Sequence, residues 1–300
     1  MKPFILTCLP SPDTGRGVGL ALVLELPGGG VWLYDTGCGY PMGTGIGPDG
    51  APHQWVGDFN AGRDLIAPFL RERGFTKIDG VVVSHAHYDH FGGLLWLEKH
   101  FPIALLVDSG YDFTGAMSAG YQRELSDFNG IRERFKARGA WKAVLGGDPI
   151  PMDPGLEVKV LAPPRGFFPD PHPEKRNPKD PASHYMLNSN ALILGIRHGK
   201  KSFVLGGDIE KEDQEELLVP SLPVGALACD VLVAPGHGLH TAENFVAATR
   251  PSLVVVSLFD RWLANCTAKT LFEASGATVR ITGDRGRVTV ESDGERIAHR

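Results

Sequence analysis

Short apolar runs bounded by Gly, Pro or Asp recur along the whole chain. Runs of this kind predict buried strands, here over residues 4–9, 18–26, 31–34, 80–84, 103–107, 144–145, 156–161, 191–196, 202–205, 231–234, 253–257, 278–282 and 287–291. Apolar residues at helical spacing predict helices over residues 64–73, 93–100, 118–138, 213–218, 242–248 and 268–275. Helices and strands alternate, but some strands are joined by turns short enough for hairpins. We therefore expect an α/β protein with mixed sheets and helices on their outer faces.

The length and composition indicate one globular domain over residues 1–300. Hydrophobic residues make up 42% of the chain and charged residues 22%, as in ordinary folded domains. The 38 glycines and 23 prolines form no repeat, so they predict tight turns and long loops. Two such loops are a Gly-rich one over 37–57 and a Pro-rich one over 163–181, which we interpret as a lid.

Charge and hydropathy exclude some classes of partner. The formal net charge of −5 offers no global excess of Lys and Arg for strong binding to duplex DNA. No apolar run approaches the ~18 residues of a membrane span, and the N-terminal residues lack a signal-peptide pattern. The four cysteines are far apart, which favours free thiols in a reducing compartment. We therefore expect a cytoplasmic protein that does not bind membranes.

The most informative motif is the sequence HAHYDH at residues 85–90, directly after a predicted strand. At strand-like spacing, His85 and His87 point to the same side, so their imidazoles can bind one metal ion. Asp89 and His90 follow where the chain turns, which places a carboxylate and a third imidazole beside that ion. Such polar side chains next to a buried strand are costly unless metal or hydrogen bonds satisfy them. The motif therefore predicts a metal site with room for a second ion.

The histidine motif resembles the signature of the metallo-β-lactamase fold, and other landmarks of that family follow in order. The sequence DTG at 35–37 ends a strand before the motif, GGD at 206–208 ends a strand after it, and GHG at 236–238 ends a third. The resemblance implies an αββα sandwich of two mixed β-sheets, with the site at one edge. It also implies that Asp208 bridges two metal ions and that His237 binds the second.

Within this superfamily, the chain is similar to the hydrolase domain of ComEC, the bacterial DNA-uptake channel. The sequence NSNALIL, which begins at Asn188, resembles the Asn-x-x-Ser-aliphatic strand of that domain, with Ala191 in place of the serine. The Gly-Asp pairs at 147–148 and 283–284 also fit, and the resemblance covers about residues 4 to 292. The chain departs from the pattern after His237, where other members have a second histidine or Gly-Ser.

The ligand types determine the expected chemistry. We predict the metal ligands to be His85, His87, Asp89, His90, Asp208 and His237. Two divalent ions about 3.5–4 Å apart can share a hydroxide and clamp the oxygen of the attacked group. His and Asp ligands without a thiolate suit Zn²⁺, and Mn²⁺ or Fe as well. We therefore expect two divalent ions, with zinc as the first choice and with Asp89 and Asp208 as catalytic residues.

Four further residues are candidates for supporting roles. Asp35 is expected to orient a ligand histidine through a carboxylate–imidazole hydrogen bond. Much of the superfamily supplies one more histidine to the first ion, and here His184, Asn188 or water fills that position. His240 is either a general acid for the leaving group or an exposed histidine at the start of a helix.

Together these features predict a soluble metal-dependent hydrolase whose dinuclear site activates a bridging hydroxide. The ComEC resemblance implies phosphodiester hydrolysis, of a small molecule such as a nucleotide or of single-stranded nucleic acid. The alternatives are a lactone, thioester or β-lactam hydrolase and, in another class, a metal-binding scaffold or regulatory protein with little turnover. The basic segment 132–138 is either a solvated helix face or a surface that attracts a phosphate substrate.

Overall fold

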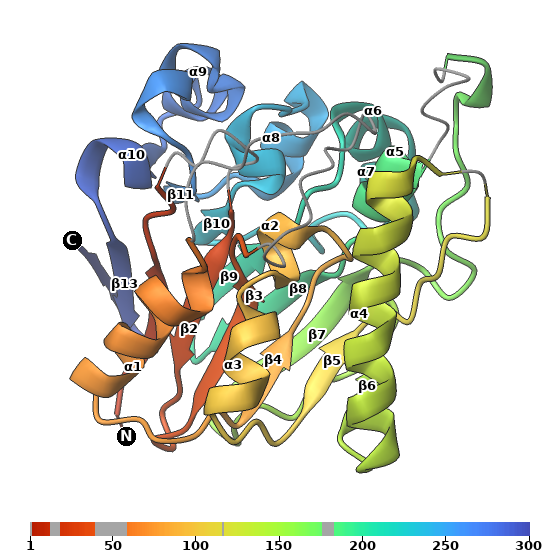
Figure 1. Cartoon of the computed structure of the whole chain (residues 1–300). Coiled ribbons are helices and arrows are strands. Elements are labelled where there is room, and N and C mark those ends of the chain that lie inside the picture. The colour runs from red at the N-terminus through yellow and green to blue at the C-terminus, as the bar shows by residue number, and fades with distance from the viewer. Residues whose placement is uncertain (1, 13–18, 40–58, 116, 176–182) are drawn as a thin grey trace.

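The strands form two mixed sheets that pack face to face (Figure 1). The computed structural model describes residues 2–12, 19–39, 59–115, 117–175 and 183–300. Most of the Gly-rich loop predicted over 37–57 lies outside these ranges. So does the end of the Pro-rich loop that we interpret as a lid.

The first sheet has eight strands, of which β3 to β6 run parallel and the rest antiparallel. In spatial order they are β14 (Ile297–His299), β13 (Val288–Ser292), β1 (Phe4–Cys8), β2 (Ala21–Glu25), β3 (Val31–Thr36), β4 (Gly80–Val82), β5 (Leu106–Asp108) and β6 (Trp141–Ala143).

The second sheet has six strands, of which β9 to β12 are parallel and β7 to β9 antiparallel. In spatial order they are β12 (Thr278–Ile281), β11 (Leu253–Val256), β10 (Val231–Val233), β9 (Lys201–Leu205), β8 (Ile193–His198) and β7 (Glu157–Ala162).

Helices cover the outer faces of the sheets, and Figure 1 shows α1, α3 and α4 lying over the first one. The α-helices are α1 (Ala67–Glu72), α2 (Tyr88–Phe91), α3 (Leu94–His100), α4 (Ala119–Ala137), α5 (Ser183–Ser189), α6 (Lys211–Asp213), α7 (Val219–Ser221), α8 (Glu243–Thr249), α9 (Thr267–Ala274) and α10 (Thr282–Arg285). Short π-helical segments are η1 (Gly62–Ile66) and η3 (Gln214–Leu218), and 3₁₀ segments are η2 (Pro173–Lys175), η4 (Pro235–Gly238) and η5 (Asp260–Asn265). The predicted αββα sandwich is confirmed.

Three apolar layers hold the sandwich together. Along β3, Trp32 and Tyr34 point into the layer between the two sheets, whereas Val31 and Leu33 point toward the helices. This two-residue alternation is the geometry of a pleated strand. A third layer lies between the second sheet and its helices. Because both faces of the central strands are buried, the strand ends that carry the site are held rigidly.

Several elements differ from the sequence predictions. The strand expected over 144–145 is wrong, because β6 ends at Ala143. Asn188, expected at the start of a strand, belongs to helix α5, and β8 begins only at Ile193. The segments predicted over 278–282 and 287–291 lie in different sheets, as β12 and β13.

Backbone and side-chain hydrogen bonds connect the two sheets beside the carboxyl ends of β3 and β4. The hydroxyl of Tyr34 donates to the carbonyl oxygen of Leu192 at 2.5 Å. The N–H of Leu192 donates to the carbonyl oxygen of Ser84 at 2.9 Å. The parallel pairs β3–β4 and β9–β10 therefore end at one shared edge. No helix in the described ranges is long and apolar enough to cross a bilayer.

Candidate metal centre

The predicted ligands come together at this shared edge from the ends of three strands. His85 and His87 follow β4, and His90 lies on the short helix α2. Asp208 follows β9, and His237 lies in η4 after β10. The backbone of His237 has φ +53°, and that of Asp35 has φ +55°. Non-glycine residues rarely adopt this conformation, and it concentrates at functional sites.

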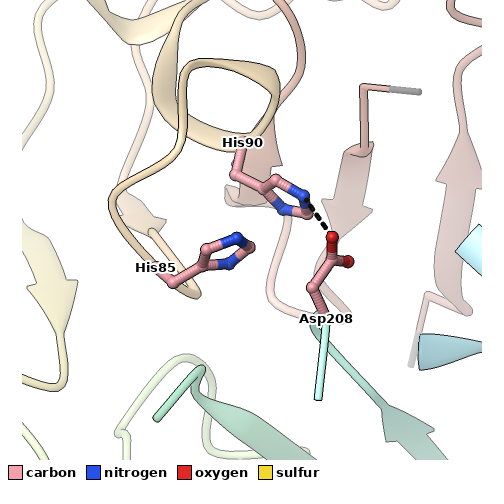
Figure 2. A group of neighbouring side chains, drawn as sticks. All are labelled: His85, His90 and Asp208. Atoms are coloured by element: carbon pink, nitrogen blue, oxygen red, sulfur yellow. Dashed lines mark hydrogen bonds and ion pairs between the residues drawn. The ribbon is translucent and has the colours of Figure 1, made fainter. Parts of the chain in front are cut away.

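Two groups of side chains place their ligand atoms within 4.8 Å of one another. The first is His85, His90 and Asp208, and the second is Asp89, His90 and His237. Figure 2 shows the first group, in which Nε2 of His90 lies 3.1 Å from Oδ2 of Asp208. Asp208 also reaches the second group, because its Oδ2 lies 3.2 Å from Nε2 of His237. His90 occurs in both groups, but with its Nδ1 held by Asp35 only Nε2 is left to bind one ion.

His87 belongs to neither of these two groups, but its ring contacts that of His85, a member of the first group. Its Nδ1 lies 2.8 Å from Nε2 of His85. A hydrogen bond between two imidazoles uses the single proton that one of the nitrogens carries. These two nitrogens converge as the sequence predicted for a pair that binds one ion.

The side chains fit a divalent metal ion. Within the described part of the chain, buried atoms of the cluster without a hydrogen-bond partner include Oδ1 of Asp208 and Nδ1 of His237. Buried polar atoms of this kind normally have a partner, and their desolvation is otherwise uncompensated. Imidazole and carboxylate are the usual ligands of zinc, manganese and iron. The cluster thus offers the ligand types and the unused atoms that such ions require.

Burial and charge shift the pKa values of this cluster in opposite directions. Burial alone would raise the pKa of Asp208, but the neighbouring imidazoles of His237 and His90 hold it well below its usual range. Burial alone would lower the pKa of His90, but the carboxylates of Asp208 and Asp35 raise it well above its usual range. A cation bound between these groups takes the place of the proton on His90.

Asp35 lies behind the ligand cluster and belongs to neither group. It is fully buried, and its Oδ2 lies 2.8 Å from Nδ1 of His90. This is the carboxylate–imidazole contact expected from the sequence, and it leaves Nε2 of His90 facing Asp208. Burial raises the pKa of Asp35, and the contacts with His90 and Ser84 oppose that shift.

Helix α4 contributes residues that the sequence analysis missed. Glu124, which is buried, accepts a hydrogen bond from the backbone N–H of Tyr88 at 3.0 Å. The ring of Tyr121 lies 5.5 Å from that of His87. Leu125, Phe128, Ile131 and Phe135 pack the same helix against the first sheet. Glu124 therefore fixes the backbone turn of the histidine motif, although no short sequence motif connects the two segments.

The remaining predicted site residues lie around the cluster. Asn188 is buried, and its Nδ2 donates to Oε1 of Glu210 at 2.7 Å, while its Oδ1 has no partner in the described ranges. His240 is exposed. The side chain of His184 lies outside what the structure describes. The roles predicted for these three residues stay predictions.

The basic segment 132–138 is not a free cationic surface. Arg132 is buried and forms an ion pair with Asp108 at 3.0 Å. Arg134 pairs with Glu98 at 2.5 Å. These pairs reduce the net positive charge of the segment, so attraction of a phosphate substrate by this helix is not supported.

Sequence comparisons give two curated relatives. ComE operon protein 3 of Bacillus subtilis (strain 168) is 27% identical over 201 residues, which is 66% of this chain and 22% of that protein. The uncharacterized protein YcaI of Escherichia coli (strain K12) is 24% identical over 293 residues, which is 94% of this chain and 30% of that protein. The chain thus spans less than a third of the length of either relative. The ComEC resemblance predicted from the sequence is confirmed as distant homology.

The fold and the family follow from two further comparisons. The structure of CmlA, a diiron β-hydroxylase from Streptomyces venezuelae, superposes with a TM-score of 0.51 and 14% sequence identity, covering 96% of this chain and 54% of that one. At this identity the likeness concerns the fold. The model of the metallo-beta-lactamase superfamily matches residues 14–245, more than half of the sequence. The chain belongs to the metallo-beta-lactamase superfamily.

Proposed function

We propose that this protein is a dinuclear metal-dependent hydrolase that cleaves a phosphodiester bond, in a nucleotide or in single-stranded nucleic acid. The observation that supports a dinuclear site is that Asp208 belongs to one ligand group and its Oδ2 lies 3.2 Å from Nε2 of His237 in the other group. Two ions on either side of this carboxylate would be close together. Bound divalent ions would lower the pKa of a coordinated water and polarise the attacked phosphoryl oxygen.

The location of each residue in the centre suggests its role. Asp208 lies between the two groups, with Oδ2 facing both His90 and His237, so it is the residue that can hold the ions at a fixed separation. Asp89 is only partly buried, whereas His90 is fully buried. The second group therefore has the more accessible carboxylate, and we place the substrate on the side of Asp89.

His240 is our candidate for the proton donor to the leaving group. It is exposed, three residues beyond His237, and its side chain packs next to Gly236. We predict that His240→Ala slows hydrolysis of a phosphodiester with a poor leaving group about 10²–10⁴-fold, the usual contribution of a general acid. A p-nitrophenyl ester, whose leaving group needs no proton, should be hydrolysed at nearly the wild-type rate. Equal loss on both substrates would remove this role from His240.

The choice of phosphodiester rests on the relationship to the ComEC-type hydrolase domain. The test is a panel of bis(p-nitrophenyl) phosphate, single-stranded DNA, a lactone, a thioester and a β-lactam, assayed with Zn²⁺ or Mn²⁺ supplied. We expect the phosphodiesters to turn over faster than the other classes. Faster turnover of a carbonyl substrate would refute the assignment and leave the fold unaffected. No turnover of any class by protein with two bound ions would favour the scaffold or regulatory alternative.

Matched variants show whether the turnover belongs to this site. Asp208→Asn keeps the shape of the side chain and removes its charge, so it should abolish turnover. Asp230→Asn is the control, because Asp230 precedes β10 at the opposite end from His237 and pairs with Lys201. The control should keep near-wild-type turnover, and its loss would point to general destabilisation or to a contaminating hydrolase.

A further inference from the structure

Ser84, the residue directly before the histidine motif, contacts three polar side chains of the centre through its hydroxyl group. It is fully buried. Its Oγ lies 2.7 Å from Oδ2 of Asp35, 2.9 Å from Nδ1 of His85 and 3.3 Å from Nδ1 of His90. Its backbone N–H donates to Oδ1 of Asp35 at 2.7 Å. One hydroxyl group thus lies between the buried carboxylate and two ligand histidines.

The number of available protons determines the direction of these hydrogen bonds. A serine hydroxyl has one proton to donate and lone pairs to accept. An ionised Asp35 can only accept, so the proton of Ser84 points to Oδ2 of Asp35. The hydroxyl oxygen is then an acceptor toward His85, and the proton between them must be on Nδ1 of His85. His90 is fixed in the same way, because its Nδ1 lies 2.8 Å from Oδ2 of Asp35.

Both ligand histidines are thereby held in the form that a metal needs. With Nδ1 as the donor nitrogen of each ring, Nε2 is the nitrogen that remains to bind an ion. Nε2 of His85 lies 2.8 Å from Nδ1 of His87, and Nε2 of His90 lies 3.1 Å from Asp208. These are the directions in which the ligand groups converge. Asp35 alone orients only His90, since its Oδ2 reaches His85 through the serine.

We propose that Ser84 is a positioning residue that transmits the orienting effect of Asp35 to His85, so that one buried carboxylate sets the proton position of two metal-binding histidines. The inference rests on the metal centre and not on the choice of substrate. It predicts that removing the hydroxyl weakens metal binding even though Ser84 does not contact the ion.

The test compares Ser84→Ala with Ser292→Ala, without any substrate. Ser292 is also a fully buried serine whose Oγ contacts a histidine, with 3.1 Å to Nδ1 of His198, but it lies on β13 outside the centre. Competition with a zinc-binding dye should show about 10–100-fold weaker zinc affinity in Ser84→Ala, the usual loss for a group that orients a ligand. Ser292→Ala should bind zinc like the wild type, and Ser84→Thr, which keeps the hydroxyl, should restore most of the affinity.

A second measurement reads the proton positions directly. Long-range ¹H–¹⁵N NMR spectra of histidine-labelled, metal-free wild-type protein should show His85 protonated on Nδ1. In Ser84→Ala the proton of His85 should redistribute between the two nitrogens, while His90 keeps its form. Protonation of wild-type His85 on Nε2, or unchanged zinc affinity in folded Ser84→Ala, would overturn the proposal. Because no turnover is measured, a failed substrate assignment leaves this result unaffected.

Discussion

His90 provides the sharpest perturbation of the centre, because its imidazole is a candidate ligand and also contacts two carboxylates, Asp35 and Asp208. We expect His90→Ala to lose the ion that Nε2 coordinates and to bind the other ion more weakly, because Asp208 keeps only its contact with His237. His85→Ala and His237→Ala should each retain about one ion per chain. The measurement is elemental analysis of protein equilibrated with a small excess of zinc and then desalted.

The cost of this substitution to the metal-free fold can be worked out from its contacts. The His90 imidazole is fully buried and contacts two carboxylates, Asp35 at 2.8 Å and Asp208 at 3.1 Å. A hydrogen bond to a charged group contributes about 1.5–3 kcal/mol, so His90→Ala, which removes two of them, should lower the free energy of unfolding by roughly 3–6 kcal/mol. At about 2–4 °C per kcal/mol, the metal-free variant should melt clearly below the wild type.

This destabilisation requires a control, so that metal loss is not confused with unfolding. His198→Ala also removes a buried histidine, one that contacts Ser292 far from the ligands. It should lower the melting temperature and still bind two ions. All variants are compared at a temperature at which circular dichroism shows them folded. Retention of two tightly bound ions in His90→Ala would refute the assignment of His90 as a metal ligand.

Three further predictions concern metal removal, pH and thiol reactivity. A chelator should remove the two ions in separate phases, with activity lost in the first, because the ligand groups differ in exposure. Metal analysis during chelation should follow the two phases, and loss of both ions in a single phase would contradict this. Zinc affinity should rise with pH, since the raised pKa of His90 means that the ion displaces a proton; titration calorimetry in buffers of different ionisation enthalpy should show proton release. The four cysteines are buried and form no disulfide with one another, and burial raises the pKa of Cys8 to about 12. A thiol reagent at pH 8 should therefore label the native protein slowly, whereas it should label all four cysteines of protein unfolded in guanidinium. Rapid labelling of the native protein would contradict the burial of the thiols.

The sequence predicted the parts of the centre that depend on short spacing. The HAHYDH motif follows a buried strand, so the positions of His85 and His87 could be derived from the strand repeat. It could not show which carboxylates His90 contacts, because this depends on how α2 places His90 between Asp35 and Asp208, 55 and 118 residues away in the sequence. The contact of Glu124 with the motif is equally non-local.

The sheet assignments at the C-terminal end show the same limit. β12 and β13 are separated only by the short helix α10, and both are short strands. β12 nevertheless adds parallel to β11 in the second sheet, while β13 pairs antiparallel with β1 in the first. Strand propensity is local, but the choice of partner is decided by packing against neighbours far away in the sequence. The position of Asn188 was mispredicted for a second reason. The apolar run after it predicts a strand, but it gives no sign of helix α5, to which Asn188 belongs.

The distribution of ligands between the sheets couples metal binding to the whole fold. The first sheet supplies His85, His87, Asp89 and His90, and the second supplies Asp208 and His237. An ion bound between them is thus an additional connection between the sheets, beside the hydrogen bond from Tyr34 to Leu192. A ligand that binds only the folded state stabilises it by about 4 kcal/mol at a free concentration 1,000 times its Kd. Ions that serve the proposed reaction would therefore also hold together the edge where it takes place. For this reason each ligand variant must be judged by its stability as well as its activity.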